Sequence, residues 1–195
     1  MGLFDHEIAH LIVKEAGRGN SHLSECAADA YAVLRHIQRY GGATDIFECA
    51  PAYTARTVIL TSPIHYTSGV IQKIANIHKE KTVDISSLSL KQTAELAGKI
   101  AIEYSLSKRT LRKIRSAYAP ARNEFKEGVL TEVTIKAIAG VMNRHKDDHD
   151  IYRAGRLFLI RADAAELMAE MARKDPAFCE TLAAMARHEN DSGVL

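Results

Sequence analysis

Apolar side chains recur along most of the chain at intervals of three and four residues, which is the spacing of one face of an α-helix. The clearest case lies between residues 21 and 40, where the members of the stripe are Ala27, Ala30, Tyr31, Leu34 and Ile37. Capping residues lie at the ends of most of these segments. Ser89 and Gln92, for example, have the form of a capping box. Helices are therefore predicted at about residues 5–16, 21–40, 62–79, 89–104, 107–118, 132–143, 163–173 and 175–188.

Two segments leave their secondary structure open. Residues 45–60 could form a helix capped by Asp45, but Thr57-Val58-Ile59-Leu60 has the composition of a strand. Residues 155–160 fit either a short strand or the end of a helix, and the charged stretch 143–150 is predicted to be a loop. We expect a mostly α protein with an N-terminal helix hairpin and little or no β-sheet, with residues 1–80 and 81–195 as two helical regions packed as one domain.

The composition narrows the class of protein. With 195 residues, 47% hydrophobic content and a net charge of +2, the chain can bury a core and has no charge excess that would by itself indicate nucleic acid. Its three cysteines are widely spaced and odd in number, which favours a reducing compartment without disulfides. No run approaches the about 20 apolar residues that a membrane helix needs, and no signal peptide is visible. We therefore expect a cytoplasmic protein with no membrane partner.

The first two predicted helices carry a candidate metal site. His6-Glu7-Ile8-Ala9-His10 is an H-E-x-x-H motif, and its two histidines are four residues apart, so both can reach one ion from one helix face. A hairpin that turns near residues 17–18 places His10 opposite Glu25 and His6 opposite Asp29. Glu25 can then be the third ligand, and Asp29 can hold His6 by its other ring nitrogen.

Two imidazoles and one carboxylate with an open fourth position suit Zn²⁺, although iron, manganese or nickel also accept such ligands. Glu7 lies where a general base for a metal-bound water would be found. The alternative is an ordinary polar stripe on an amphipathic helix.

The two motifs together resemble the gluzincin class of zinc metallopeptidases, over about residues 3–40. In that class H-E-x-x-H on one helix is completed by E-x-x-x-D, often E-x-x-A-D, on the next, and here Glu25-Cys26-Ala27-Ala28-Asp29 matches it. The resemblance implies His6, His10 and Glu25 as zinc ligands, Glu7 as general base and Asp29 as the residue that orients His6. Gluzincins carry a small β-sheet before the motif. Only five residues precede His6 here, so we expect a longer protein, a sheet supplied elsewhere, or a metal site without peptidase activity.

Three further features of the sequence have candidate roles. His65 and Tyr66 could stabilise the oxyanion formed when water attacks a carbonyl, or could simply pack in the first turn of a helix. The polar run 145–150 has ligand-type side chains without the spacing of a closed site, and Cys26 is expected to be a small core residue.

Residues 93–114 are similar to bacterial helix-turn-helix segments, although the linker in the motif is several residues too long for the usual helix-turn-helix and an aliphatic run extends the first helix. The cations that could contact nucleic acid are Lys108, Arg109, Arg112 and Lys113, together with Arg115. The alternative is a solvated basic helix face.

The sequence thus predicts a zinc-dependent peptide hydrolase acting on a peptide or protein. The alternative is a helical DNA- or protein-binding regulator whose metal site is structural or vestigial. The substrate, the metal and the oligomeric state stay open.

Overall fold

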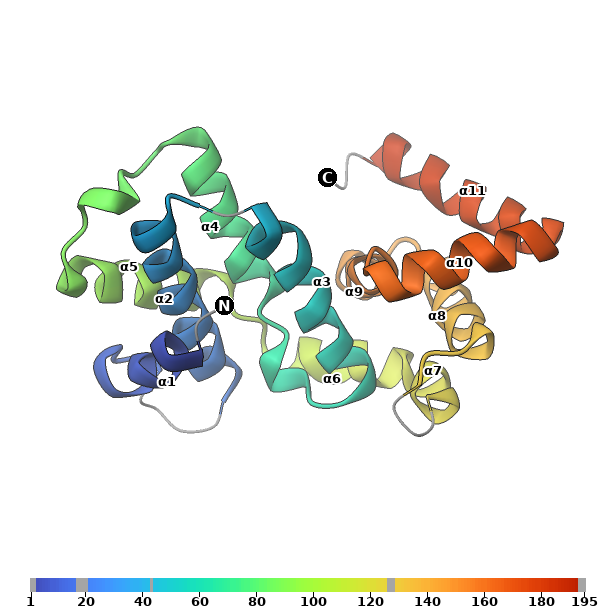
Figure 1. Ribbon diagram of the computed structural model, residues 1–195. Helices are drawn as coiled ribbons and strands as arrows, with labels where there is room; N and C mark the ends of the chain where they lie inside the picture. The colour runs from blue at the N-terminus through green and yellow to red at the C-terminus, as the bar shows by residue number, and fades with distance from the viewer. Residues whose placement is uncertain (1–2, 17–20, 43, 126–128, 193–195) are drawn as a thin grey trace. The chain divides into compact units, whose positions relative to one another are not determined.

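The protein is described by a computed structural model covering residues 3–16, 21–42, 44–125 and 129–192, and every regular element in these ranges is helical. The prediction of a mostly α protein with little or no β-sheet is confirmed, because the described ranges contain no strand. The α-helices are α1 (Leu3–Ile12), α2 (His22–Tyr40), α3 (Thr44–Leu60), α4 (Ser68–Glu80), α5 (Leu90–Tyr104), α6 (Lys108–Ala117), α7 (Ala119–Glu124), α8 (Glu132–Arg144), α9 (His149–Leu159), α10 (Ala162–Lys174) and α11 (Pro176–Ser192). Two 3-10 turns, η1 (Pro63–His65) and η2 (Ile85–Ser87), flank α4 (Figure 1).

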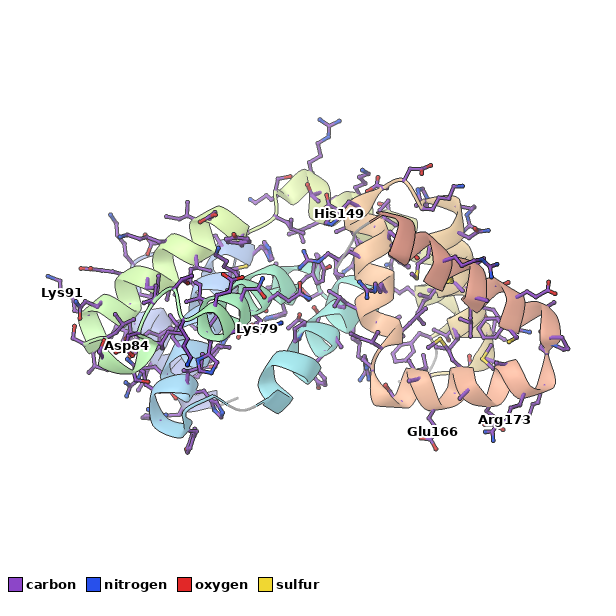
Figure 2. The ribbon with its side chains drawn as sticks, turned by 90° about the horizontal axis from the view of Figure 1, so that it is seen from above. Lys79, Asp84, Lys91, His149, Glu166 and Arg173 are labelled. Atoms are coloured by element: carbon purple, nitrogen blue, oxygen red, sulfur yellow. The ribbon has the colours of Figure 1, made fainter. Side chains whose placement is uncertain are left out.

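The chain divides into two compact units, Met1–Arg112 and Lys113–Leu195. Exposed polar side chains include Lys79, Asp84 and Lys91 in the first unit, and Glu166 and Arg173 on α10 in the second (Figure 2). The expected packing of residues 1–80 and 81–195 as one domain stays a prediction. No helix in the described ranges has both the length and the apolar character that crossing a bilayer requires.

Helix α2 is the centre of the first unit. Its predicted apolar stripe is buried, and it packs against α1, α4 and α5. Ser21 caps its N-terminus by accepting a hydrogen bond from the Ser24 amide, and Gly41 ends it in the left-handed conformation with φ 74°. The helix predicted over residues 21–40 is therefore present, because local capping and core burial act on the same residues.

The first ambiguous segment is helical. Residues 45–60 lie in α3, which includes Pro51, so the strand alternative for residues 57–60 is wrong. The hydroxyl groups of Thr54 and Ser68 donate to the Pro51 carbonyl oxygen at 3.1 and 2.7 Å, which ties α3 to the start of α4. Tertiary contacts thus override the β preference of the branched residues.

The helix predicted over residues 62–79 is split. A 3-10 turn ends at His65. The next two residues, Tyr66 and Thr67, are not helical, and α4 begins only at Ser68. This interruption matters for the site, because it places Ile64, His65 and Thr67 against α2 rather than along a helix axis.

The second unit contains α7 to α11 and the last part of α6, from Lys113 onward. Tyr118 is fully buried and donates to the Ile151 carbonyl oxygen at 2.8 Å. A Cβ atom on Gly155 would lie 2.1 Å from the Tyr118 hydroxyl, so only glycine allows α9 to lie this close to the Tyr118 side chain. The strand alternative for residues 155–160 is wrong, since α9 runs through Leu159. The predicted loop at 143–150 shrinks to a short turn in which Asp148 caps α9.

Candidate metal centre

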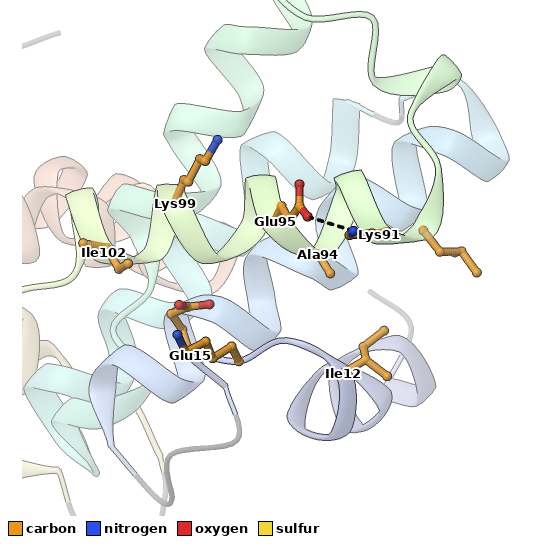
Figure 3. Close-up of a pocket in the computed structure, with 9 residues that line it drawn as sticks. Ile12, Glu15, Lys91, Ala94, Glu95, Lys99 and Ile102 are labelled. Atoms are coloured by element: carbon orange, nitrogen blue, oxygen red, sulfur yellow. Dashed lines mark ion pairs between the residues drawn. The ribbon is translucent and has the colours of Figure 1, made fainter.

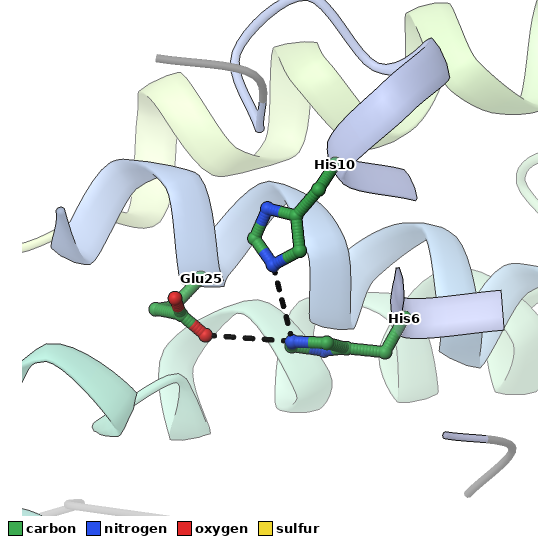
Figure 4. Close-up of side chains that lie close together, drawn as sticks. All are labelled: His6, His10 and Glu25. Carbon is green, nitrogen blue, oxygen red and sulfur yellow. Dashed lines mark hydrogen bonds and ion pairs between the residues drawn. The ribbon is translucent and has the colours of Figure 1, made fainter. Parts of the chain in front are cut away.

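Two helices bring the predicted ligands together. His6 and His10 lie one turn apart on α1, Glu25 lies in the first turn of α2, and α1 packs directly on α2 (Figure 4). His6 Nδ1 is 2.8 Å from Asp29 Oδ1, which is the contact expected from the hairpin register. The predicted turn at residues 17–18 lies outside the described residues.

The three donor atoms lie within 4.8 Å of one another, and two of their separations are those of ligands on one ion. His6 Nε2 is 3.3 Å from His10 Nε2 and 3.4 Å from Glu25 Oε2. Two nitrogen ligands about 2.05 Å from one zinc ion at the tetrahedral angle lie about 3.3 Å apart. The pair of imidazoles therefore needs little rearrangement to accept zinc, and the residues present fit the ion that the sequence predicts.

Both rings are held by their other nitrogen. His6 Nδ1 donates to Asp29, and His10 Nδ1 donates to the Ala16 carbonyl oxygen at 3.0 Å. Ser24 supports the second contact, because its hydroxyl also donates to that carbonyl and lies 3.2 Å from His10 Nδ1. Each Nε2 is thereby turned into the cluster, as is usual for metal-binding histidines. Sequence reasoning missed the roles of Ser24 and Ala16, since neither has a residue type or spacing that marks it.

Close contacts between imidazole rings and carboxylates shift the pKa values of His6 and Glu25. Hydrogen bonds to Asp29 and to Glu25 raise the pKa of His6 from 6.5 to about 10, against the opposing effect of burial. Burial disfavours the ionised form of Glu25, yet the hydrogen bond from His6 and the nearby imidazoles hold its pKa below its ordinary value. A positive charge between the two carboxylates is therefore favoured, and either a proton on His6 or a metal cation can supply it.

His65 reaches the cluster from η1. Its Nδ1 is 3.1 Å from Glu25 Oε2, and 49% of its side chain is exposed, so the ring lies at the rim with Nε2 still available. Tyr66 is only 5% exposed, which agrees better with the packing alternative than with contact to a substrate. Glu7 is exposed and follows His6 on α1, about 100° further round the helix. The catalytic roles of Glu7, His65 and Tyr66 stay predictions.

Thr67 makes a contact with Asp29 that the sequence did not reveal. Its hydroxyl donates to Asp29 Oδ2 at 2.5 Å, and the residue is fully buried. A lone threonine before a helix is usually a cap, so no pattern in the sequence links it to His6.

His22 and Cys26 lie next to the cluster without joining it. His22 Nδ1 donates to the Ile64 carbonyl oxygen at 2.8 Å, and burial lowers the pKa of the ring. Cys26 Sγ is 3.5 Å from His22 Nε2, and burial raises the pKa of its thiol. Cys26 is completely buried, as expected for a small core residue.

A separate groove of about 660 Å³ lies in the first unit between the end of α1 and α5 (Figure 3). Its lining residues include Ile12, Glu15, Lys91, Glu95 and Lys99, and none of them belongs to the metal cluster. This groove is thus not the place where the predicted chemistry would occur.

Among the residues that the structure describes, His6, His10 and Glu25 are the one group of His, Cys, Asp or Glu side chains close enough to share a metal ion. The cluster could hold a metal ion, and these donors do not by themselves select which ion. No protein-family model matches the chain, and neither the curated proteins nor the solved structures contain a match to it. The geometry of the cluster is therefore what supports an assignment of function.

Proposed function

We propose that the protein is a zinc-dependent peptide hydrolase whose zinc ligands are His6, His10 and Glu25. One observation carries the proposal: the two Nε2 atoms lie 3.3 Å apart while both Nδ1 atoms are held by hydrogen bonds. This arrangement leaves the fourth position of a tetrahedral ion for water or substrate, as in catalytic rather than structural zinc sites.

The side chains around the cluster divide the chemistry between them. Bound zinc would supply an acidic water and a Lewis acid for the carbonyl group. Glu7 would accept a proton from that water and return it to the amine that leaves. His65, whose Nδ1 is engaged with Glu25, presents its Nε2 at the exposed rim as the hydrogen-bond donor to the developing oxyanion.

The proposal is tested with the wild-type protein and a broad peptide library. We expect cleavage by the zinc-loaded protein, read by mass spectrometry, that disappears after chelation and returns when zinc is restored. Cleavage that survives complete removal of the metal would contradict the proposal, because Glu7 has no acidic water to deprotonate without the ion.

A second candidate, a DNA-binding regulator, has one observation in its favour. Helix α5 extends to Tyr104 and α6 starts at Lys108, so three residues connect the two helices. Helix-turn-helix motifs use turns of about three or four residues. Lys108, Arg109 and Arg112 are exposed, whereas Lys113 pairs with Asp148.

For this candidate we expect DNA binding that weakens with salt and falls in the variant Arg109→Ala/Arg112→Ala, because each lost cation removes a phosphate contact. Fluorescence anisotropy with a labelled duplex measures both effects. Arg173→Ala/Lys174→Ala, a matched pair of exposed cations on α10, is the control. If both double variants lose DNA affinity equally, the binding depends only on net charge and not on α6. If the wild-type protein does not bind DNA, the DNA-binding regulator is ruled out.

A further inference from the structure

The segment Ile64–Thr67 lies along the polar face of α2 and is attached to it at three points. The Ile64 carbonyl oxygen accepts from His22 Nδ1 at 2.8 Å, and His65 Nδ1 contacts Glu25 at 3.1 Å. The third contact, from Thr67 to Asp29, is the shortest at 2.5 Å. Since His22, Glu25 and Asp29 are three and four residues apart, they share one helix face, and the segment forms a wall of the metal cluster.

The contact between Thr67 and Asp29 is fully inside the protein. Thr67 is 0% exposed and Asp29 is 7% exposed. The two carboxylate oxygens are divided between two partners, because Oδ1 meets His6 Nδ1 and Oδ2 accepts from the Thr67 hydroxyl. A buried carboxylate held at both oxygens cannot rotate without losing a hydrogen bond, so its orientation is set from both sides.

The Thr67 hydroxyl does not cap α4, which would be its alternative role. Thr67 occupies the cap position, yet its side chain makes no capping hydrogen bond. A threonine at this position ordinarily accepts a hydrogen bond from one of the first helical amides. The Thr67 backbone meanwhile accepts from the Val70 and Ile71 amides at 3.0 and 3.2 Å, so the hydroxyl projects from a well-anchored residue.

We infer that Thr67 is a positioning residue of the metal site, which fixes Asp29 and through it directs His6 Nε2 toward the ion. The inference rests on the proposed metal binding and deepens it, since it makes the start of α4 part of the site. Metal affinity thus depends on a hydroxyl that touches neither the ion nor its ligands.

The test is the zinc dissociation constant, measured by competition with a chromophoric chelator. We expect Thr67→Val, which keeps the branched shape and removes the hydroxyl, to weaken zinc binding about tenfold, and Thr67→Ser to stay within about threefold of wild type. Thr93→Val is the matched control, because Thr93 is also fully buried and hydrogen-bonded, to Ser89 and Gln38, and is not part of the metal cluster. It should leave the zinc dissociation constant unchanged.

A double-mutant cycle separates positioning from a general loss of stability. Asp29→Ala should weaken zinc binding by about 10–100-fold, and adding Thr67→Val to Asp29→Ala should weaken it no further, because Thr67 acts through Asp29. Unfolding of the metal-free variants is measured in parallel. If Thr67→Val does not fold, Thr67→Ala replaces it in the cycle, since it puts no methyl group against the carboxylate.

The outcomes distinguish this inference from the proposed function. Unchanged zinc affinity in Thr67→Val or Thr67→Ala, or additive losses in the cycle, would overturn the role of Thr67 while leaving the zinc site intact. Weakened and non-additive zinc binding without any peptide cleavage by wild type would support Thr67 and contradict only the hydrolase. A wild type that binds no zinc would overturn both.

Discussion

Replacing His10 with alanine is expected to abolish stoichiometric zinc binding. His10 contributes one of the two imidazole nitrogens that lie 3.3 Å apart, and its removal leaves His6 and Glu25 as the remaining protein ligands. Losing a direct ligand should cost more than the about 10–100-fold typical of losing a supporting hydrogen bond. Elemental analysis of protein purified without chelator should find about one zinc ion per wild-type chain and almost none in His10→Ala.

The matched control is His149→Ala, because His149 is an exposed histidine of the second unit and is not part of the cluster. Its zinc content should equal that of wild type. Equal zinc in His10→Ala and wild type, or a wild type free of zinc, would refute the assignment of the site. Circular dichroism should show that His10→Ala keeps its helices, because His10 is not one of the residues of the hydrophobic core around α2.

Glu7→Gln is expected to keep zinc and to lose hydrolysis. Glutamine has nearly the same shape as glutamate, but its amide cannot accept a proton from the attacking water. Glu7 is exposed on α1 and is absent from the cluster of ligand atoms, so its replacement should leave zinc content at the wild-type level. Loss of a general base typically lowers the rate by about 10²–10⁴-fold.

The measurement is cleavage of the peptide library by zinc-loaded wild type and variant at equal metal content. Glu15→Gln is the control, because Glu15 is a second glutamate near the end of α1 that lines the separate groove. It should cleave as wild type does. Equal cleavage by Glu7→Gln and wild type would remove Glu7 from the mechanism and would leave His65 as the group at the rim to examine next.

The helical class and the main helix positions followed from local signals. The stripe on residues 21–40 and the capping box at Ser89 each act within a few residues of sequence, and α5 begins directly after Ser89, as predicted. The candidate ligands were also accessible from sequence, because the spacing of four between His6 and His10 has a direct meaning on a helix. The contact of His6 with Asp29 needed only one further assumption, an antiparallel hairpin.

The remaining features depend on segments that are far apart in the chain. Nothing local distinguishes Thr67 from an ordinary cap or Ser24 from a surface serine, and their roles appear only when η1, α4 and the end of α1 pack around α2. The helical state of residues 45–60 and the break before α4 have the same origin, since core burial outweighs weak local preferences there. Sequence alone therefore determined which side chains could bind a metal ion. Tertiary structure decided how their rings are held, because hydrogen bonds between distant segments orient the donor atoms.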